Sequence, residues 1–205
     1  YRLLYDPNFK FEGEGTEESP YLIQNAEDLS MFSNFLNSGE YTDAYFKLTN
    51  DIDMAGAKYT TVATFRGTFD GDGHVISNLT INNSGVTNVG LIGFLEGGTI
   101  KNLGIVDSTI TGGDKVGAFA GRTMHATIYN CYGKNVTVSG GNDVGGLVGM
   151  CNNSVVENCF TTGTITGTGI SIGGVFGSMN SSLDANPEAQ MVVNNCYSTA
   201  VAKGE

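Results

Sequence analysis

The chain has 205 residues and a formal net charge of −11, and this length can bury a sizeable core in one domain, or in one large and one small unit. The negative charge makes nucleic acid and anionic membrane surfaces unfavourable partners. No apolar run approaches the roughly 20 residues of a transmembrane helix, so the sequence predicts no membrane insertion within this chain.

The composition is typical of a β-rich protein. The 30 glycines accompany many threonine, asparagine and serine residues and no tryptophan, which favours short strands joined by turns. No basic and then apolar signal segment opens the chain. We therefore expect a mature or trimmed form whose export signal lies outside this sequence.

Residues 1–60 are predicted to form an N-terminal capping segment with one amphipathic helix. The stretch NAEDLSMFSNFLNSG has Asn25 as its N-cap, acidic residues in the first turn and Gly39 just past the end. Its apolar stripe consists of Leu29, Phe32, Phe35 and Leu36. A strand is expected around residues 45–48. Because an open solenoid end exposes core and strand edges, the helix is expected to be a lid, with a partner-binding groove as the functional alternative.

Residues 61–205 contain an internal repeat. VGLIGF, VGAFAG, VGGLVG and IGGVFG recur at intervals of 27 or 28 residues from Val89 to Ile172. Each unit alternates short β-branched runs with turn residues, and a unit of this size cannot bury its own apolar face without neighbours. The predicted fold is therefore all-β, a right-handed parallel β-helix (solenoid) of about five coils with a helix-containing cap. A propeller is the rival, but its units are about 40 residues or longer.

A second signature follows in each unit, an apolar residue two positions before an asparagine that precedes leucine or cysteine. The asparagines of this signature are Asn78, Asn102, Asn130, Asn158 and Asn195. We expect them to stack as an inward ladder, since a buried amide without partners is costly. The last signature arrives about nine residues late, so SLDANPEAQ, residues 182–190, is interpreted as a loop that bulges from one coil.

The glycines of VGGLVG are expected at a corner of each coil, where the backbone needs a positive φ or approaches the next coil closely. The run lacks the Lys-Ser or Lys-Thr ending of a phosphate-binding loop. Leu147 and Val148 are expected to straddle the bend, with matching apolar residues inside. These are Leu91, Ile92, Phe119, Val175 and Phe176.

Cys131, Cys159 and Cys196 share one position of the repeat and are expected to stack as buried thiols, because in-register Cβ vectors do not converge as a disulfide requires. Cys151 is expected on a turn. Zinc is not predicted, since the sequence has no C-x-x-C pair and its two histidines lie in different coils.

Asp70 and Asp72 in FDGDGH, with His74 beside them, are the nearest candidates for a catalytic site. Hydrolysis on a β-helix needs a carboxylate pair within about 10 Å, and a lyase needs a calcium cluster with a basic proton acceptor. A tight turn between two strands is the stronger interpretation, and the further ligands of a calcium loop are absent from the motif. We therefore predict that the protein is not an enzyme, and we assign no catalytic, cofactor-binding or metal-ligating residues.

Hydroxyl residues recur at one place in three successive coils. The tripeptides are Thr109–Thr111, Thr137–Ser139 and Thr164–Thr166. Period-two geometry points these residues outward in two short ladders. An ordinary solvent face of β-forming residues is the expected role, and binding of ice or sugar is the alternative. Absence of thermal hysteresis at high protein concentration would remove ice binding.

The chain resembles bacterial cell-surface proteins with GLUG repeats over roughly residues 13–201. The resemblance rests on GEGTEESPYLIQNAEDLSMFSNFLNSG, YFKLTNDIDMAG, FRGTFDGDGHVISNLTI and the repeated VGGLVG and NCY blocks, with a departure at residues 118–120. It implies an exported right-handed β-helix of the kind found in adhesin-like proteins and in non-catalytic parts of large surface peptidases.

The resemblance and these observations together predict a non-catalytic, adhesin-like binding or stalk module that is secreted or displayed on a bacterial cell surface as part of a longer surface protein. Its partner is expected to be a host or environmental glycan or an extracellular protein. The alternative is a polysaccharide-processing enzyme, either a lyase or a glycosidase, because such enzymes also use the β-helix fold.

Overall fold

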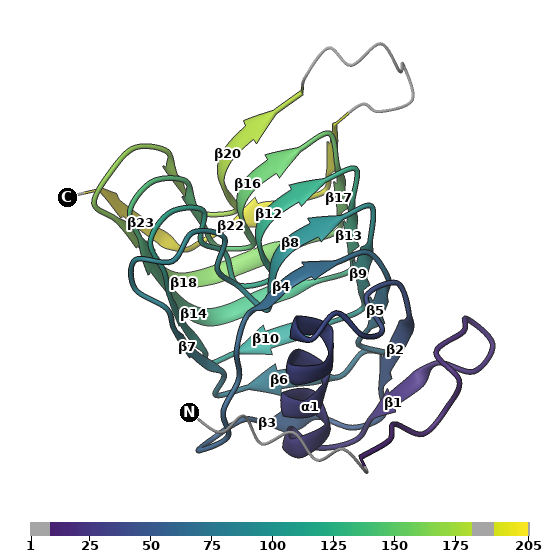
Figure 1. Ribbon diagram of the computed structural model, residues 1–205. Helices are drawn as coiled ribbons and strands as arrows, with labels where there is room; N and C mark the ends of the chain where they lie inside the picture. The colour runs from purple at the N-terminus through teal and green to yellow at the C-terminus, as the bar shows by residue number, and fades with distance from the viewer. Residues whose placement is uncertain (1–8, 182–190, 205) are drawn as a thin grey trace.

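The computed structural model describes residues 9–181 and 191–204, which form a stack of β-coils with one α-helix at the N-terminal end (Figure 1). Equivalent strands of successive coils pair in parallel. Long parallel sheets therefore run along the stack. The predicted parallel β-helix with a helical cap is confirmed.

The elements follow the chain in coil order. Before the first complete coil come β1 (Tyr21–Ile23), α1 (Ala26–Asn37), β2 (Tyr45–Leu48) and β3 (Ile52–Asp53). The first coil holds β4 (Val62–Phe65), β5 (Thr68–Asp70), β6 (Val75–Ser77) and β7 (Thr80–Asn82). The second holds β8 (Ile92–Glu96), β9 (Thr99–Lys101), β10 (Gly104–Val106) and β11 (Thr109–Thr111). The third holds β12 (Ala120–Met124), β13 (Thr127–Tyr129) and β14 (Tyr132–Gly140).

The last two coils complete the stack. The fourth holds β15 (Val144–Gly145), β16 (Val148–Asn152), β17 (Val155–Glu157) and β18 (Phe160–Gly167). The fifth holds β19 (Ile172–Gly173), β20 (Phe176–Asn180), β21 (Val192–Asn194), β22 (Tyr197–Ser198) and β23 (Val201–Gly204). The described residues after position 61 thus form five coils, as the repeat predicts.

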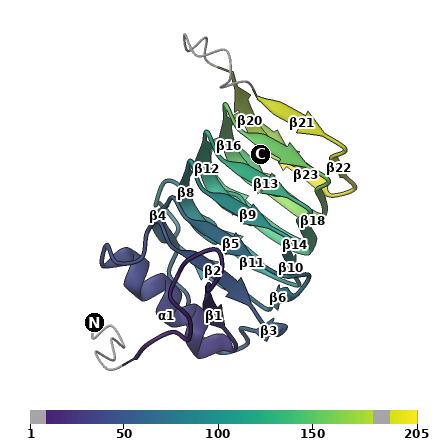
Figure 2. The same ribbon diagram turned by 90° about the vertical axis from the view of Figure 1, so that its right-hand side faces the viewer.

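Three sheets make the walls of the solenoid. Sheet A has the order β1-β2-β5-β9-β13-β17-β21, and Figure 2 shows its strands stacked along one face. Sheet B contains β3, β6, β10, β14, β18 and β22, together with β7, β11 and β23. Sheet C has the order β4-β8-β12-β16-β20, while β15 and β19 form a separate pair. The segment 1–60 therefore contributes strands to sheets A and B.

Helix α1 has the boundaries that its sequence predicts. The side chain of Asn25 accepts a hydrogen bond from the Asp28 backbone N at 3.0 Å, and Gly39 follows the helix with a φ of 90°. Phe32 fills the N-terminal end of the coil interior, where its ring lies 4.8 Å from Phe46 and 5.2 Å from Phe69. The helix thus covers the core at this end, as a lid.

Polar side chains of α1 also satisfy the backbone beside the first strand of sheet C. Asn37 accepts a hydrogen bond from the Ala63 backbone N at 2.8 Å, and its amide donates to the Thr61 carbonyl at 3.1 Å. The hydroxyl of Ser33 donates to the Thr60 carbonyl. These bonds replace those that a preceding coil would make, because an unpaired strand edge needs partners or cover.

The interior consists of columns of equivalent apolar residues. In sheet A, Ile100, Ile128 and Val156 stack in register and each is fully buried. The residues expected inside beside the glycine corner, Leu91, Ile92, Phe119, Leu147 and Val148, are also fully buried. Their counterparts in the fifth coil, Val175 and Phe176, are half-buried. The predicted facing of these residues is confirmed.

The glycines of VGGLVG provide close packing rather than a positive φ. Gly145, Gly146 and Gly149 all have ordinary backbone angles, so that part of the prediction is wrong. A Cβ on Gly149 would lie 2.5 Å from the Val116 backbone N, and one on Gly145 would lie 2.5 Å from the Gly177 backbone N. The expected close approach between coils is therefore confirmed as the reason for glycine here.

Asparagine, not glycine, supplies the positive φ at the corner between sheets A and B. Asn102, Asn130, Asn158 and Asn195 have φ angles of 52°, 52°, 53° and 50°. Each amide of the last three donates to the side-chain oxygen of the asparagine before it, at 3.2, 3.3 and 2.8 Å. The ladder is real, but these three side chains are exposed, so the predicted inward direction is wrong. The corner turns the asparagine out and the next residue in.

Asn78 belongs to a different corner from the rest of the ladder. Ile76 pairs with Ile105, whereas Ile100 pairs with Phe69. Asn78 therefore stands one corner later, in line with Asp107 and Asn135, where φ is again positive at 55°, 49° and 53°. Both corners favour residues that tolerate a left-handed backbone. Because asparagine suits both corners, the motif around Asn78 looks like the motif around Asn102, although the two asparagines stand at different corners.

Three cysteines form a single column, as predicted. Tyr132, Phe160 and Tyr197 pair in register, so the residues before them, Cys131, Cys159 and Cys196, lie one above another. All four cysteines of the chain are free thiols.

Cys151 differs from its prediction. It lies within β16 and not on a turn, it is fully buried, and its sulfur accepts a hydrogen bond from the Thr123 hydroxyl at 3.4 Å. Strand alternation turns it into the core. The expected loop at residues 182–190 lies outside the described residues.

Substitution at the glycine corner tests the assigned facing. Leu147→Asp places an unpaired charge in the core and should lower the free energy of unfolding by more than about 4 kcal/mol. Thr137→Asp changes an exposed residue on sheet B and should cost under about 1 kcal/mol. Urea denaturation of both variants measures the difference. Equal losses of stability would contradict the facing of these columns.

Candidate functional site

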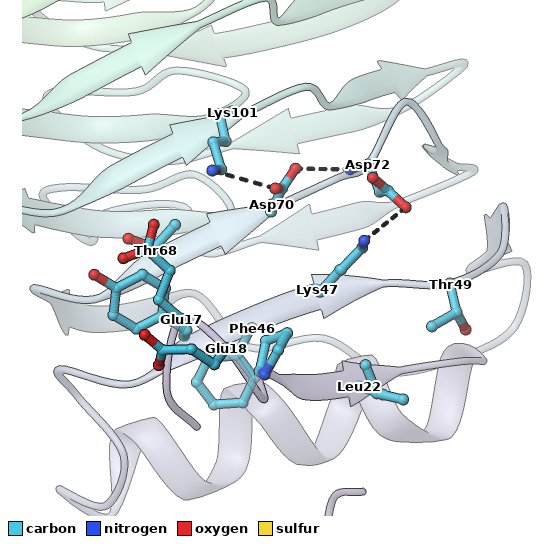
Figure 3. A pocket seen from close by; sticks show the side chains of 12 residues that line it. Glu17, Glu18, Leu22, Phe46, Lys47, Thr49, Thr68, Asp70, Asp72 and Lys101 are labelled. Carbon is cyan, nitrogen blue, oxygen red and sulfur yellow. Dashed lines mark hydrogen bonds and ion pairs between the residues drawn. The ribbon is translucent and has the colours of Figure 1, made fainter. Parts of the chain in front are cut away.

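A groove of about 510 Å³ lies on the outside of sheet A near its N-terminal end (Figure 3). Strands β2, β5 and β9 form its floor, and the segment 17–20 before β1 forms a wall. The floor residues include Tyr45, Lys47, Thr68, Asp70, Asp72 and Lys101, and the wall includes Glu17, Glu18 and Pro20. Two of the three catalytic candidates from the sequence, Asp70 and Asp72, line this groove.

Strand register places three charged residues of the floor in one outward column. Lys47 in β2 pairs with Asp70 in β5, and Asp70 pairs with Lys101 in β9. The residues beside them, Phe46, Phe69 and Ile100, are buried, so the alternation of a strand points the charged side chains outward. Asp72 comes from the turn after β5, where its φ is 50°.

Two ion pairs neutralise both carboxylates of this turn. Lys101 Nζ lies 3.3 Å from Asp70 Oδ2, and Lys47 Nζ lies 3.0 Å from Asp72 Oδ2. Asp70 Oδ1 also accepts hydrogen bonds from the Asp72 backbone N at 2.9 Å and the Asn102 amide at 3.0 Å. Asp70 is thus held in place by three partners, and Lys101 is held by Asp70.

The environment keeps Asp70 ionised and Lys101 protonated. Burial alone raises the pKa of Asp70, but the hydrogen bonds from Asp72 and Asn102 and the charge of Lys101 outweigh it, and the pKa lies below its ordinary value. Burial alone lowers the pKa of Lys101, but the Asp70 carboxylate outweighs it, and that pKa lies above its ordinary value.

Asp70 does not fit the role of a catalytic acid, and Lys101 does not fit that of a catalytic base. A glycosidase needs one carboxylic acid that stays protonated near neutral pH, with a raised pKa, and a lyase needs a base that can accept a proton. Asp70 has a lowered pKa and Lys101 a raised pKa. The groove offers paired charges, hydroxyl groups and the Tyr45 side chain, which can contact a ligand.

The other sequence candidates lie apart from the groove lining. His74 Nδ1 contacts Asp51 Oδ1 at 3.1 Å, and the same oxygen accepts the Val75 backbone N–H. His125 stands on a turn after β12 with a φ of 52°. Among the described residues, no group of three or more His, Cys, Asp or Glu side chains could hold a metal ion.

Sequence reasoning missed the two lysines and the acidic wall of the groove. Lys47 lies before the repeats begin, and Lys101 has no lysine counterpart in the next coil, where β13 has Tyr129 at this position. The one signal is the alternation of charge from Lys47 to Asp70 to Lys101. It can be recognised only when the strand register is known.

The hydroxyl tripeptides of sheet B are in register, as predicted. Thr109 pairs with Thr137, and Thr137 pairs with Thr164. The central residues Ile110, Val138 and Ile165 are fully buried, so their hydroxyl neighbours point outward. The column extends to Thr80 in β7 and to Val201 in β23.

No protein-family model matches the chain. Among curated proteins, halomucin from Haloquadratum walsbyi is 36% identical over 137 residues, and a candidate Gly-rich membrane protein from Evansella cellulosilytica is 33% identical over 110 residues. These matches cover 58% and 48% of this chain but only 2% and 12% of the two relatives. The chain therefore spans a small part of their lengths, and its resemblance to GLUG-repeat proteins stays a prediction.

A solved structure from Bacteroides ovatus, that of a candidate immunoglobulin A1 protease, is similar to this chain with a TM-score of 0.64. The two are 24% identical, and the similarity covers 94% of this chain and 79% of the other. At this identity the likeness shows the fold alone. Within the described residues, no helix has the length and apolar character needed to cross a membrane.

The ion pair in the groove predicts a pH-dependent contribution to stability. The pKa of Asp70 in the folded protein is lower than its unfolded value near 3.8, so its contribution is present above that value and is lost as pH falls through the folded pKa. Asp70→Asn should therefore lower the free energy of unfolding at neutral pH and have a smaller effect at a pH well below 3.8.

Urea denaturation at the two pH values measures this difference. Asp43→Asn is the matched control, because Asp43 is exposed and lies outside the groove lining. A loss of stability with Asp70→Asn that is equal at both pH values would show that the Asp70 charge does not stabilise the groove.

Proposed function

We propose that this chain is a non-catalytic binding module of a cell-surface or secreted protein, and that it contacts a glycan or a protein through the groove on sheet A. The observation that carries the proposal is the groove itself, a concavity whose floor charges are paired and held in fixed positions. Such preorganised groups favour binding, because little side-chain freedom is lost when a ligand arrives.

The surface location rests on the relatives and on the architecture. One relative is named as a membrane protein, and both are far longer than this chain. A solenoid also suits a role as a spacer or stalk, since each added coil lengthens the stack by the same step. Display on the outer surface of a bacterium is part of this proposal.

The enzymatic alternative draws on one specific feature. Asp70 and Asp72 line the same groove, as two carboxylates of a glycosidase would. Against it stand their ion pairs with lysines and the lowered pKa of Asp70. The same experiment can therefore decide between binding and catalysis.

The test is an array of glycans and extracellular matrix proteins, run beside a panel of polysaccharide degradation assays. We expect a retained ligand and no release of reducing sugar or unsaturated product. Thr68→Trp fills the floor of the groove and should abolish retention. Thr109→Trp is the matched control, since Thr109 is an outward residue of sheet B and should leave binding unchanged.

Two results would contradict the proposal. Product release that is lost with Asp70→Asn would identify an enzyme. Retention that survives Thr68→Trp would place binding outside the groove.

A further inference from the structure

The groove opens onto a polar row that continues along sheet A. Thr68 in β5 pairs with Thr99 in β9, and Thr99 pairs with Thr127 in β13. The next residues, Phe69, Ile100 and Ile128, are fully buried, so the three threonines face outward. They form a straight row of hydroxyl groups with a step of about 4.8 Å per coil.

A second row lies beside the threonines at the corner of sheets A and B. The Asn102 amide donates to Asp70 in the groove, and Asn130 donates to Asn102 at 3.2 Å. An amide has two N–H groups and an oxygen with two lone pairs. Each asparagine that donates once and accepts once within the ladder therefore keeps one donor and one acceptor for a ligand. Tyr129 lies between the two rows, in the column of Lys101.

These residues define a surface that we name the polar track. It consists of Thr68, Thr99, Thr127, Asn102, Tyr129 and Asn130. None of the large exposed apolar side chains of the described residues belongs to the track; they are at Val86, Ile170, Met179 and in β21, β22 and β23. Beyond Thr127 the threonine column continues as Val155 and the exposed Val192, so the hydroxyl row ends at the third coil. A protein interface needs an apolar centre, so the track favours a ligand rich in hydroxyl groups. The Tyr129 side chain adds an aromatic surface against which sugar C–H groups can pack.

The charge of the protein favours neutral over acidic hydroxyl-rich polymers. The two groove lysines are already paired with aspartates, and Glu17 and Glu18 add negative charge at the wall. The whole chain has a net charge of −11. An acidic polysaccharide is therefore repelled both at long range and at the groove, while a neutral one is not.

From these observations we infer that the polar track binds an extended, neutral polysaccharide whose chain runs along the axis of the coil stack and ends in the groove. This inference rests on the proposed function and names its ligand class. The repeat of the track matches a polymer better than a single sugar, because a threonine recurs one step further along in three successive coils and an asparagine stands beside it in the second and third. A chain that contacts several coils gains affinity with length, as linked contacts do.

The probes for the test are neutral polysaccharides (β-glucan, galactomannan and arabinoxylan) and acidic ones (polygalacturonate, alginate and chondroitin sulfate), measured by affinity electrophoresis. Short oligosaccharides of each neutral polymer that binds are then titrated by calorimetry. We expect a neutral polymer to bind, affinity to rise with chain length, and binding to persist in high salt, since neutral contacts are not screened.

Thr127→Glu separates the track from the groove. Thr127 lies two coils beyond Thr68 of β5 and does not line the groove. The variant should weaken binding of the polymer at least about fivefold, the equivalent of one lost hydrogen bond, and leave the shortest oligosaccharides unaffected. Thr109→Glu makes the same change at an outward threonine of sheet B and should bind as the original chain does. Thermal melting of both variants checks that they fold.

The outcomes distinguish this inference from the proposed function. Unchanged polymer binding by folded Thr127→Glu, or preferential binding of acidic polymers, overturns the track. If Thr68→Trp still abolishes binding in that case, the proposed groove stands. A ligand that proves to be a protein also overturns the track and leaves the binding module intact. No binding to any glycan or protein overturns both.

Discussion

Hydrogen bonding between equivalent strands holds each residue of one coil above its counterpart in the next, and the rest of the structure depends on this stacking. A coil is too small to bury its own apolar residues, so burial comes from the neighbours. Val156 and Val193 share one inward column, yet Val156 is fully buried between two coils while Val193, in the fifth coil, is 41% exposed. A valine at this position of the repeat is thus buried where a further coil packs on it and partly exposed in the fifth coil.

The N-terminal end shows what can replace a coil. Helix α1 supplies Phe32 for the interior and the polar groups of Ser33 and Asn37 for the strand edge. Both roles are needed, because an apolar cover alone leaves backbone groups without partners. The amphipathic pattern of residues 25–39 was sufficient to predict the helix and its lid role. It was not sufficient to predict that asparagine and serine would bind the edge.

The period of the repeat predicts which residues share a column but not where the column faces. Cys131, Cys159 and Cys196 were predicted correctly because a shared column is all that their stacking requires. The inward direction of the asparagine ladder and the turn position of Cys151 were predicted wrongly. Both statements depend on where the corners of a coil lie, and the period does not give this. Two corners that both favour a left-handed residue look alike in sequence, which also explains the misplaced Asn78.

Stacking treats neutral and charged residues differently, and this difference bears on where a solenoid can place a specific site. Threonine, asparagine and cysteine gain from identical neighbours, whereas identical charges directly opposite each other destabilise a sheet. The column of Lys47 and Asp70 therefore alternates in sign up to Lys101, and Tyr129 then separates Lys101 from Glu157. Charged residues of one column cannot simply be copied from coil to coil. The ion pairs of the described residues accordingly lie between positions 47 and 101, where the repeat begins. This is why the groove lay beyond the reach of an argument from the repeat, whereas the asparagine row beside it was predicted from that repeat.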